Sequence, residues 1–368
     1  MLTLRRHLVP RGVESVARRV SVVAATAALV TSVATSLVMP LHAQSERRPT
    51  APSTARDPML SRLEAEITRL AAIAGGKVGV AAVHLETGRE VVLNRGEPFP
   101  MASTYKVPIA VQLLSRVDSG ALRLDSMITL RPSDLHPGSG TLTQLFDDPG
   151  VSLSVRNLLE LMLLISDNSA TDIMLRTAGG SAPVNGRMRG LDVSGISVDR
   201  PTVNLIADAV GVKNLPPESE LNPQVFRTLS RGVSSEAQKA AAEAFYQDRR
   251  DTSTPEGMAR LLETIWRGRA LSKQNTELLL DIMRRCETGP NRIKGLLPPD
   301  VVVRHKTGTL GIGVANDVGI VELPNGGGNL VLAIFVKEST RPAEQQERTI
   351  AQIARAAYDY FLFNPGTR

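Results

Sequence analysis

The chain has 368 residues, of which 42% are hydrophobic, and it carries a formal net charge of +6 and a single cysteine, Cys286. Five arginines and one glutamate lie in residues 1–43, so four of the six net charges belong to that segment. The remainder is close to neutral, which removes the charge argument for a nucleic-acid-binding protein. One cysteine excludes an internal disulfide. The three histidines beyond residue 43 are widely spaced, so we expect no metal and no other cofactor.

The N-terminal segment is typical of a secretory signal. Its arginines come first, residues 20–39 are uncharged, and Leu41-His42-Ala43 offers a small-residue cleavage site. A membrane anchor is the alternative, because the apolar stretch is nearly long enough to span a bilayer. The alanine, serine and threonine content favours cleavage. We therefore predict a signal peptide at 1–43, a flexible linker at 44–57 that is rich in serine, proline and arginine, and a periplasmic or secreted protein without stable membrane association.

Hydrophobic periodicity predicts the elements of the remaining chain. Apolar residues at helical spacing predict a helix over 58–74, and strands at 78–85 and 90–93 flank a Thr-Gly turn. A helix begins at Ser103, an extended piece covers 125–130, and a Pro/Gly loop covers 134–140. Further helices are predicted at 154–165, 171–176, 255–266, 271–285 and 343–361, and strands at 301–305, 317–323 and 330–337.

The strands lie at the two ends of this chain and the helices lie in the middle. That order predicts an α+β fold, in which one antiparallel sheet is built from both chain ends and is flanked by helices. An all-helical lobe would be inserted at about 122–270, within a single catalytic domain at 58–368. We expect a monomer.

Ser103 and Lys106 place a hydroxyl and an amine at the head of an apolar helix. Residues three apart share a helix face. A serine needs a base to become a nucleophile, and a lysine can be that base only if its pKa is lowered. Chance supplies such a pair about once or twice in a chain of this length, so its meaning depends on other motifs.

Two further motifs indicate that Ser103 and Lys106 belong to a catalytic site. Ser-Asp-Asn at 166–168 ends the apolar helix, and Lys-Thr-Gly-Thr at 306–309 follows a predicted strand. In this order the three motifs resemble those of the penicillin-recognising serine hydrolases, and the Ser-Asp-Asn form resembles class A β-lactamases. The resemblance spans roughly residues 60–361. It implies a β-lactamase/transpeptidase-like fold, a β-lactam as the small-molecule partner, hydrolysis of its amide bond through a serine acyl-enzyme, and antibiotic resistance.

The resemblance also implies roles for the first two motifs. Ser103 would attack the lactam carbonyl, and its backbone N–H would form part of the oxyanion hole. Lys106 would hold or accept the serine proton. Ser166 would relay a proton to the leaving nitrogen. Asn168 would bind the amide of the substrate side chain and orient Lys106.

The third motif would bind substrate. Lys306 would place positive charge near the substrate carboxylate, with Thr307 beside it. Gly308 would let the strand approach the substrate closely, and the N–H of Thr309 would complete the oxyanion hole. Arg292 is a candidate second cation for the carboxylate; the alternative is a solvated surface charge.

The sequence departs from the class A pattern at the glutamate that activates the deacylating water. Asp199-Arg200 is followed by Pro201-Thr202, and Thr202 occupies the position where the glutamate is expected. A matching segment, Glu-Ser-Glu-Leu-Asn, begins sixteen positions later at Glu218. Either the loop carries an insertion and Glu218 folds back into the site as the base, or Glu218 is solvated and the match is accidental.

Asp251 resembles the acid that pins this loop through an ion pair with Arg200. We therefore predict an enlarged loop at 200–251, with an extra helix over 234–246, as a small added subdomain beside the active site.

Two other functions share the motifs. A D-Ala-D-Ala peptidase or transpeptidase uses the same three, although the Ser-Asp-Asn form and the absence of a second large domain argue against it. A penicillin-binding sensor that is acylated without turnover is the other alternative, and Thr202 in place of the glutamate motivates it.

Overall fold

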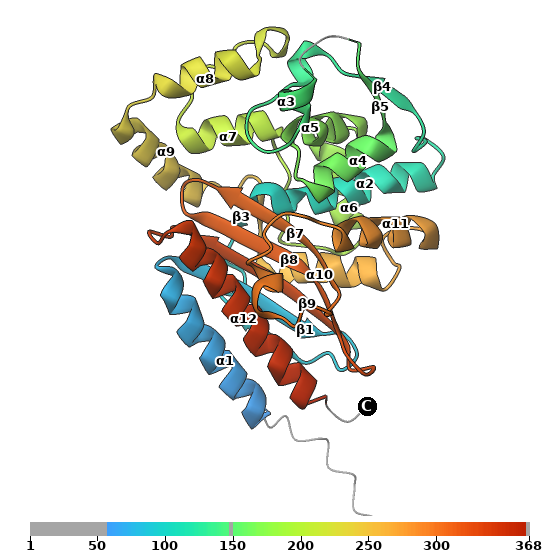
Figure 1. The fold of residues 1–368 in the computed structure, drawn as a ribbon, viewed down its shortest axis with the longest axis vertical. Coiled ribbons are helices and arrows are strands. Elements are labelled where there is room, and N and C mark those ends of the chain that lie inside the picture. The colour runs from blue at the N-terminus through green and yellow to red at the C-terminus, as the bar shows by residue number, and fades with distance from the viewer. Residues whose placement is uncertain (1–56, 147–149, 366–368) are drawn as a thin grey trace, which may run out of the picture. The chain divides into compact units, whose positions relative to one another are not determined.

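A five-stranded antiparallel sheet forms the centre of the computed structural model, which describes residues 57–146 and 150–365 (Figure 1). From edge to edge the strands are β2 (Glu90–Leu93), β1 (Lys77–His84), β9 (Gly328–Lys337), β8 (Val314–Leu323) and β7 (Val303–Leu310). Strand β1 pairs with β9 from Lys77 opposite Lys337 to His84 opposite Leu330. The predicted sheet built from both chain ends is confirmed.

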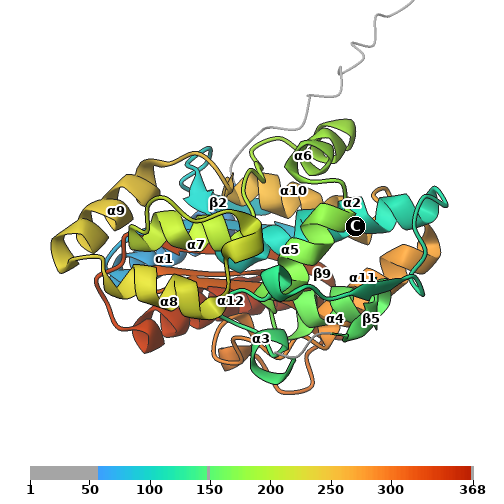
Figure 2. The ribbon, with the colours of Figure 1, turned by 90° about the horizontal axis from the view of Figure 1, so that it is seen from above.

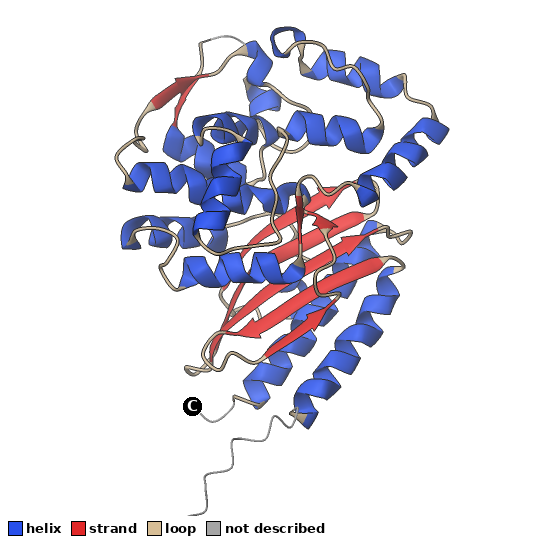
Figure 3. Cartoon of the chain, turned by 180° about the vertical axis from the view of Figure 1, so that it is seen from behind, coloured by secondary structure: helices blue, strands red, loops and turns tan. Residues whose placement is uncertain are grey.

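Alternation along the strands divides the core into two layers. In β9, Leu332 and Ile334 pack in one cluster, and the intervening Ala333 packs in the other. Successive side chains of a strand point to opposite faces, so a strand that is apolar throughout must be covered on both sides. Helices α1 (Pro58–Ala71) and α12 (Ala343–Phe363) lie side by side on one face (Figure 3).

The opposite face carries α10 (Pro255–Trp266) and the helical lobe. Helix α2 (Lys106–Asp118) is almost entirely buried at its start, because it runs between the sheet and the lobe. The other elements of this part are η2 (Ala102–Tyr105), η3 (Pro132–Asp134), α3 (Leu142–Leu145), α4 (Val155–Leu164), α5 (Asn168–Thr177), α6 (Ser181–Gly190) and α11 (Lys273–Arg284). The turn η5 (Ile293–Leu296) packs against α12 on the other face. Short strands pair as β3 (Phe99–Pro100) with β6 (Thr252–Ser253) and as β4 (Met127–Thr129) with β5 (Ser152–Ser154).

A group of helices fills the predicted enlarged loop. It comprises α7 (Thr202–Val210), the single turn η4 (Glu218–Glu220), α8 (Pro223–Arg231) and α9 (Ser235–Gln247). Figure 2 shows α7, α8 and α9 together, on the opposite side of the domain from α4 and α11. Ser234 caps α9, which matches the helix predicted over 234–246. A small apolar cluster that includes Val203, Leu221 and Phe226 joins α7 to α8. Helix α9 packs against α7 through Phe245, which lies in a second cluster with Leu205 and Ala209.

Several boundaries differ from the prediction, and two of them involve the sequence motifs. The Lys-Thr-Gly-Thr motif lies inside β7 and does not follow its end, because pairing with β8 continues to Leu310 opposite Val314. Helix α5 begins at Asn168, three residues before the predicted start, because the Asp167 carboxylate accepts the N–H of Ala170 and caps it.

The predicted signal peptide at 1–43 and most of the linker at 44–57 lie outside the described residues. Asp57, the last linker residue, caps α1 by accepting the N–H of Met59. None of the helices within 57–146 and 150–365 has the length and apolar character needed to cross a membrane.

Candidate active site

Ser103 lies in η2, a 3-10 turn that leads directly into α2. We predicted the first turn of an α-helix, but the consequence is the same, because residues i and i+3 of a 3-10 turn are eclipsed. Ser103 and Lys106 therefore face one side. The preceding residue, Ala102, has a φ of 47°. A non-glycine residue is strained in this left-handed region, so the surrounding packing must hold the turn in place.

Lys106 is fully buried, and its ammonium group touches the Ser-Asp-Asn motif. Its Nζ donates to the carbonyl oxygen of Ser166 at 2.7 Å, to Ser166 Oγ at 3.0 Å and to Asn168 Oδ1 at 3.1 Å. Ser166 has a φ of 61°, which turns the chain so that both its carbonyl and its hydroxyl meet the lysine. The structure thus brings together the first two predicted motifs.

Lys306 reaches the same hydroxyl from β7. Its Nζ donates to Ser166 Oγ at 2.9 Å and to the carbonyl oxygen of Thr307 at 2.9 Å. Ser166 Oγ therefore lies between two buried lysine side chains.

Burial lowers the pKa of both lysines. Burial, and then the charge of Lys306, holds the pKa of Lys106 well below its usual range. Burial lowers the pKa of Lys306 to about 8. A lysine with a lowered pKa can be neutral near physiological pH, as a proton acceptor must be.

Gly308 allows β7 to lie against the segment that carries the nucleophile. A Cβ at Gly308 would come within 2.5 Å of the Met101 carbonyl oxygen and 3.0 Å of the Ser103 nitrogen. Asn316 fastens the two segments, because its Nδ2 donates to the carbonyl oxygens of Pro100 at 2.8 Å and Met101 at 2.9 Å. Asn316 lies inside β8, directly opposite Gly308.

Arg292 is buried behind the end of β7 and is not a solvated charge. Its Nη1 donates to the carbonyl oxygens of Gly308 at 2.9 Å and Asn316 at 2.8 Å, and its Nη2 donates to Thr309 Oγ1 at 2.7 Å. The Nε pairs with Glu347 at 3.1 Å. All three guanidinium nitrogens have protein partners, so Arg292 supports the strand that carries Thr309.

A cavity of about 500 Å³ joins these residues. Its floor contains Ser103, Ser166 and Asn168, and β7 contributes Thr307 and Thr309. The far wall is apolar and belongs to α7 and to the turn after β7, with Leu205, Ile206, Ala209, Val210, Leu310 and Ile312. The cavity therefore combines an activated serine with room for an apolar substituent.

Comparison with known proteins agrees with this arrangement. Residues 62–361 match the model of the beta-lactamase enzyme family. The chain is 30% identical over 293 residues to beta-lactamase VEB-1 from Pseudomonas aeruginosa, which covers 78% of this chain and 86% of VEB-1. It belongs to the class A serine β-lactamase family.

Solved structures also resemble this class A protein in fold. An ancestral class A beta-lactamase (GNCA) is 30% identical with a TM-score of 0.66, covering 81% of this chain and 99% of the other. A mutant of PBP-A, solved as an acyl-enzyme complex with penicillin G, is 28% identical with a TM-score of 0.64, covering 82% and 97%.

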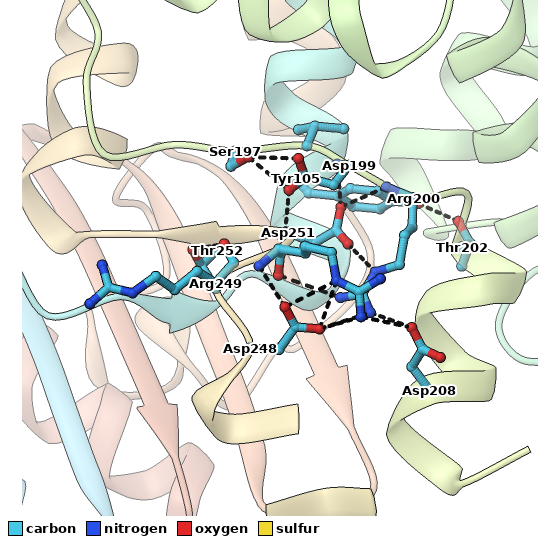
Figure 4. A network of polar contacts seen from close by, with 12 residues as sticks. Tyr105, Ser197, Asp199, Arg200, Thr202, Asp208, Asp248, Arg249, Asp251 and Thr252 are labelled. Atoms are coloured by element: carbon cyan, nitrogen blue, oxygen red, sulfur yellow. Dashed lines mark hydrogen bonds and ion pairs between the residues drawn. The ribbon is translucent and has the colours of Figure 1, made fainter. Parts of the chain in front are cut away.

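The predicted ion pair fastens the enlarged loop of this class A β-lactamase (Figure 4). Arg200 Nε lies 2.6 Å from Asp251 Oδ2, and its Nη1 contacts Asp208 and, at 3.1 Å, Asp248. Asp251 also accepts the backbone N–H groups of Asp199 and Arg200 at 2.7 and 3.1 Å. Both ends of the loop are thus held at one buried point.

Glu218 does not lie with Ser103. Its carboxylate is exposed and pairs with Arg131 at 2.7 Å and Arg176 at 3.7 Å. Glu218 lines a separate cavity with His136, and this cavity has no lining residue in common with the pocket of Ser103. The structure thus places Glu218 at the surface, outside the pocket of Ser103.

Replacing Glu218 with Gln is therefore expected to leave the turnover number within about twofold of wild type, because exposed ion pairs contribute little. The matched control is Glu220→Gln, at the other end of the same turn. Steady-state hydrolysis of a chromogenic cephalosporin measures both. A loss of turnover in Glu218→Gln alone would return this residue to the mechanism.

Thr202 lies at the pocket, where the family glutamate is expected. Its Oγ1 contacts the Tyr105 hydroxyl, and its N–H donates to Asp172 Oδ1 at 2.6 Å. Sequence reasoning missed Tyr105 and Asp172. Tyr105 lies between the serine and lysine that define the first motif, and Asp172 follows the second motif by four residues, so neither carried a recognisable signal.

Proposed function

We propose that this protein hydrolyses the amide bond of β-lactams through an acyl-enzyme on Ser103, and that it thereby confers resistance to these antibiotics. The contact of two buried lysines with Ser166 Oγ, in the pocket that holds Ser103, supports this most directly. The acyl-enzyme complex of the PBP-A mutant with penicillin G supports the acylation step by similarity.

Acylation follows from the proton acceptors present. Neutral Lys106 takes the Ser103 proton as Oγ attacks the lactam carbonyl, and Ser166 passes a proton from the lysine to the leaving nitrogen. The N–H groups of Ser103 and Thr309 stabilise the oxyanion. Asn168 binds the amide of the substrate side chain.

The third motif binds the substrate carboxylate. Protonated Lys306 supplies the charge, and the next residue, Thr307, lines the pocket. Gly308 gives the strand its close approach. Arg292 contributes its positive charge from behind Thr309.

We also propose that the enzyme acts in the periplasm or as a secreted monomer after removal of residues 1–43. A linker at 44–57 would precede one catalytic domain at 58–368, with its helical lobe at about 122–270 and the enlarged loop at 200–251. The capping of α1 by Asp57 supports that domain start.

The test is incubation of the purified protein with a chromogenic cephalosporin, with intact mass recorded over time. Continuous product with little adduct is the expected result. A single burst with a persistent adduct would indicate an acylated sensor, and release of D-Ala from a pentapeptide would indicate a peptidase. Either outcome would overturn the proposal.

The pH dependence of kcat/KM is expected to show the Lys306 titration. This lysine is protonated below its pKa of about 8 and neutral above it. The attraction for a substrate carboxylate is therefore lost as pH rises, and kcat/KM falls by up to about tenfold per pH unit above 8. A methyl ester of the same substrate should show no such decline. An equal decline with the ester would assign the titration to another group.

A further inference from the structure

The pocket of Ser103 contains no carboxylate among the described residues that line it. This matters for the second half of the proposed reaction, on which the following inference rests. An acyl-enzyme ester is hydrolysed only if a base takes a proton from the attacking water. That base must therefore be another group at this pocket.

Tyr105 and Thr202 form a hydroxyl pair in the pocket wall. The Tyr105 hydroxyl contacts Thr202 Oγ1, and both residues line the cavity that holds Ser103. Burial holds the pKa of Tyr105 well above its usual range, so this hydroxyl stays protonated and serves as a donor and acceptor but not as the base.

Asp172 positions Thr202 from behind. Its two carboxylate oxygens accept the N–H of Thr202 at 2.6 Å and the N–H of Val203 at 3.2 Å. Its Oδ2 also lies 3.3 Å from His136 Nε2, and Asp172 lines the neighbouring cavity with His136. The Asp172 carboxylate therefore accepts hydrogen bonds from the first turn of α7 and does not line the pocket of Ser103. Asp172 is thus a positioning residue.

Two lysines contact Ser166 Oγ, and Lys306 is protonated when it binds the substrate carboxylate, so Lys106 is the group that remains as a base. It is eclipsed with Ser103 across η2, and its Nζ contacts Ser166 and Asn168, which both line the pocket. Its lowered pKa leaves a lone pair available once acylation has returned its proton through Ser166.

We propose that Lys106 also activates the deacylating water, and that the Tyr105–Thr202 hydroxyl pair positions this water against the ester. The water oxygen bonds to the ester carbonyl carbon while its proton passes to Lys106 Nζ. The tetrahedral intermediate then collapses, the carbon–Oγ bond of Ser103 breaks, and Lys106 returns the proton to that oxygen. The products are the free acid, Ser103 with its hydroxyl, and neutral Lys106, so no further reactant is needed.

The test uses two variants that remove one hydroxyl each, Thr202→Val and Tyr105→Phe. Thr202→Val keeps the backbone N–H that Asp172 holds. Matched controls are Thr349→Val and Tyr358→Phe, which are buried in α12. The burst phase with a chromogenic cephalosporin gives the acylation rate constant, and decay of the adduct mass after removal of substrate gives the deacylation rate constant.

In both variants deacylation is expected to slow by roughly 10- to 100-fold, because a misplaced nucleophile costs about that much. Acylation should stay within about twofold, so kcat and KM fall together and kcat/KM is preserved. A general loss of structure would lower kcat/KM instead. In wild type the deacylation rate should rise with pH and level off as Lys106 becomes neutral.

Unchanged deacylation in both variants would overturn the inference, as would a deacylation block in Glu218→Gln. These results differ from a failure of the proposed function itself. If the proposed function itself failed, the wild-type protein would not release hydrolysed product continuously, whether or not it formed an adduct, whereas failure of this inference alone leaves wild-type turnover intact.

Discussion

Replacement of Ser103 by alanine is expected to lower β-lactam hydrolysis on the order of a million-fold, which is the scale of losing a catalytic nucleophile. No other described hydroxyl in the pocket combines an eclipsed lysine with a strained turn that fixes its direction. Alanine keeps the turn and removes only the attacking oxygen. Steady-state turnover measures the loss, and intact mass should show no adduct.

Lys106→Ala provides the companion measurement. If the two residues act as one unit, the double variant will be about as slow as the slower single variant. If the two residues contributed independently, the rate losses of the single variants would multiply. A double variant far slower than either single variant would therefore show that Ser103 and Lys106 do not act together. Circular dichroism of each variant controls for folding, because Lys106 is fully buried.

Much of the fold could be predicted because buried apolar residues recur along the sequence with the period of the helix or strand that they belong to. The sequence of β9 is an unbroken apolar run, which indicates a strand that is covered on both faces, and its residues do pack in two clusters. Capping residues mark the starts of α9 and α10. The spacing of Ser103 and Lys106 fixes their proximity within one turn. These features are local, so a single sequence contains them.

The path of the chain within the enlarged loop could not be predicted from local patterns. The position of Glu218 depends on the path of the chain after α7, which is set by contacts such as Val203 with Phe226 in a small apolar cluster. Likewise, the partner of the Tyr105 hydroxyl lies 97 residues away. Such pairings arise from tertiary packing, and no spacing rule encodes them.

The enlarged loop is also held by the buried cation of Arg200, and its removal is expected to have a large effect on stability. Arg200→Met is expected to lower the free energy of unfolding by about 3–5 kcal/mol, because it leaves the Asp251 carboxylate buried without its cation. Asp251 is 1% exposed, and its Oδ2 lies 2.6 Å from Arg200 Nε. The matched control is Arg249→Met, an exposed neighbour that should change stability by less than about 0.5 kcal/mol. Urea denaturation measures both.

The penalty in Arg200→Met should depend on pH in a defined direction. Burial already raises the pKa of Asp251 in the wild-type protein, and loss of Arg200 raises it further. The folded variant then binds more protons than the unfolded chain, so its stability falls as pH rises. The difference from wild type should therefore be smallest at acidic pH, grow as the pH passes the usual range of a carboxyl, and level off above the folded pKa of Asp251. A penalty that is independent of pH would mean that lost packing of the arginine side chain, and not the stranded carboxylate, destabilises the loop.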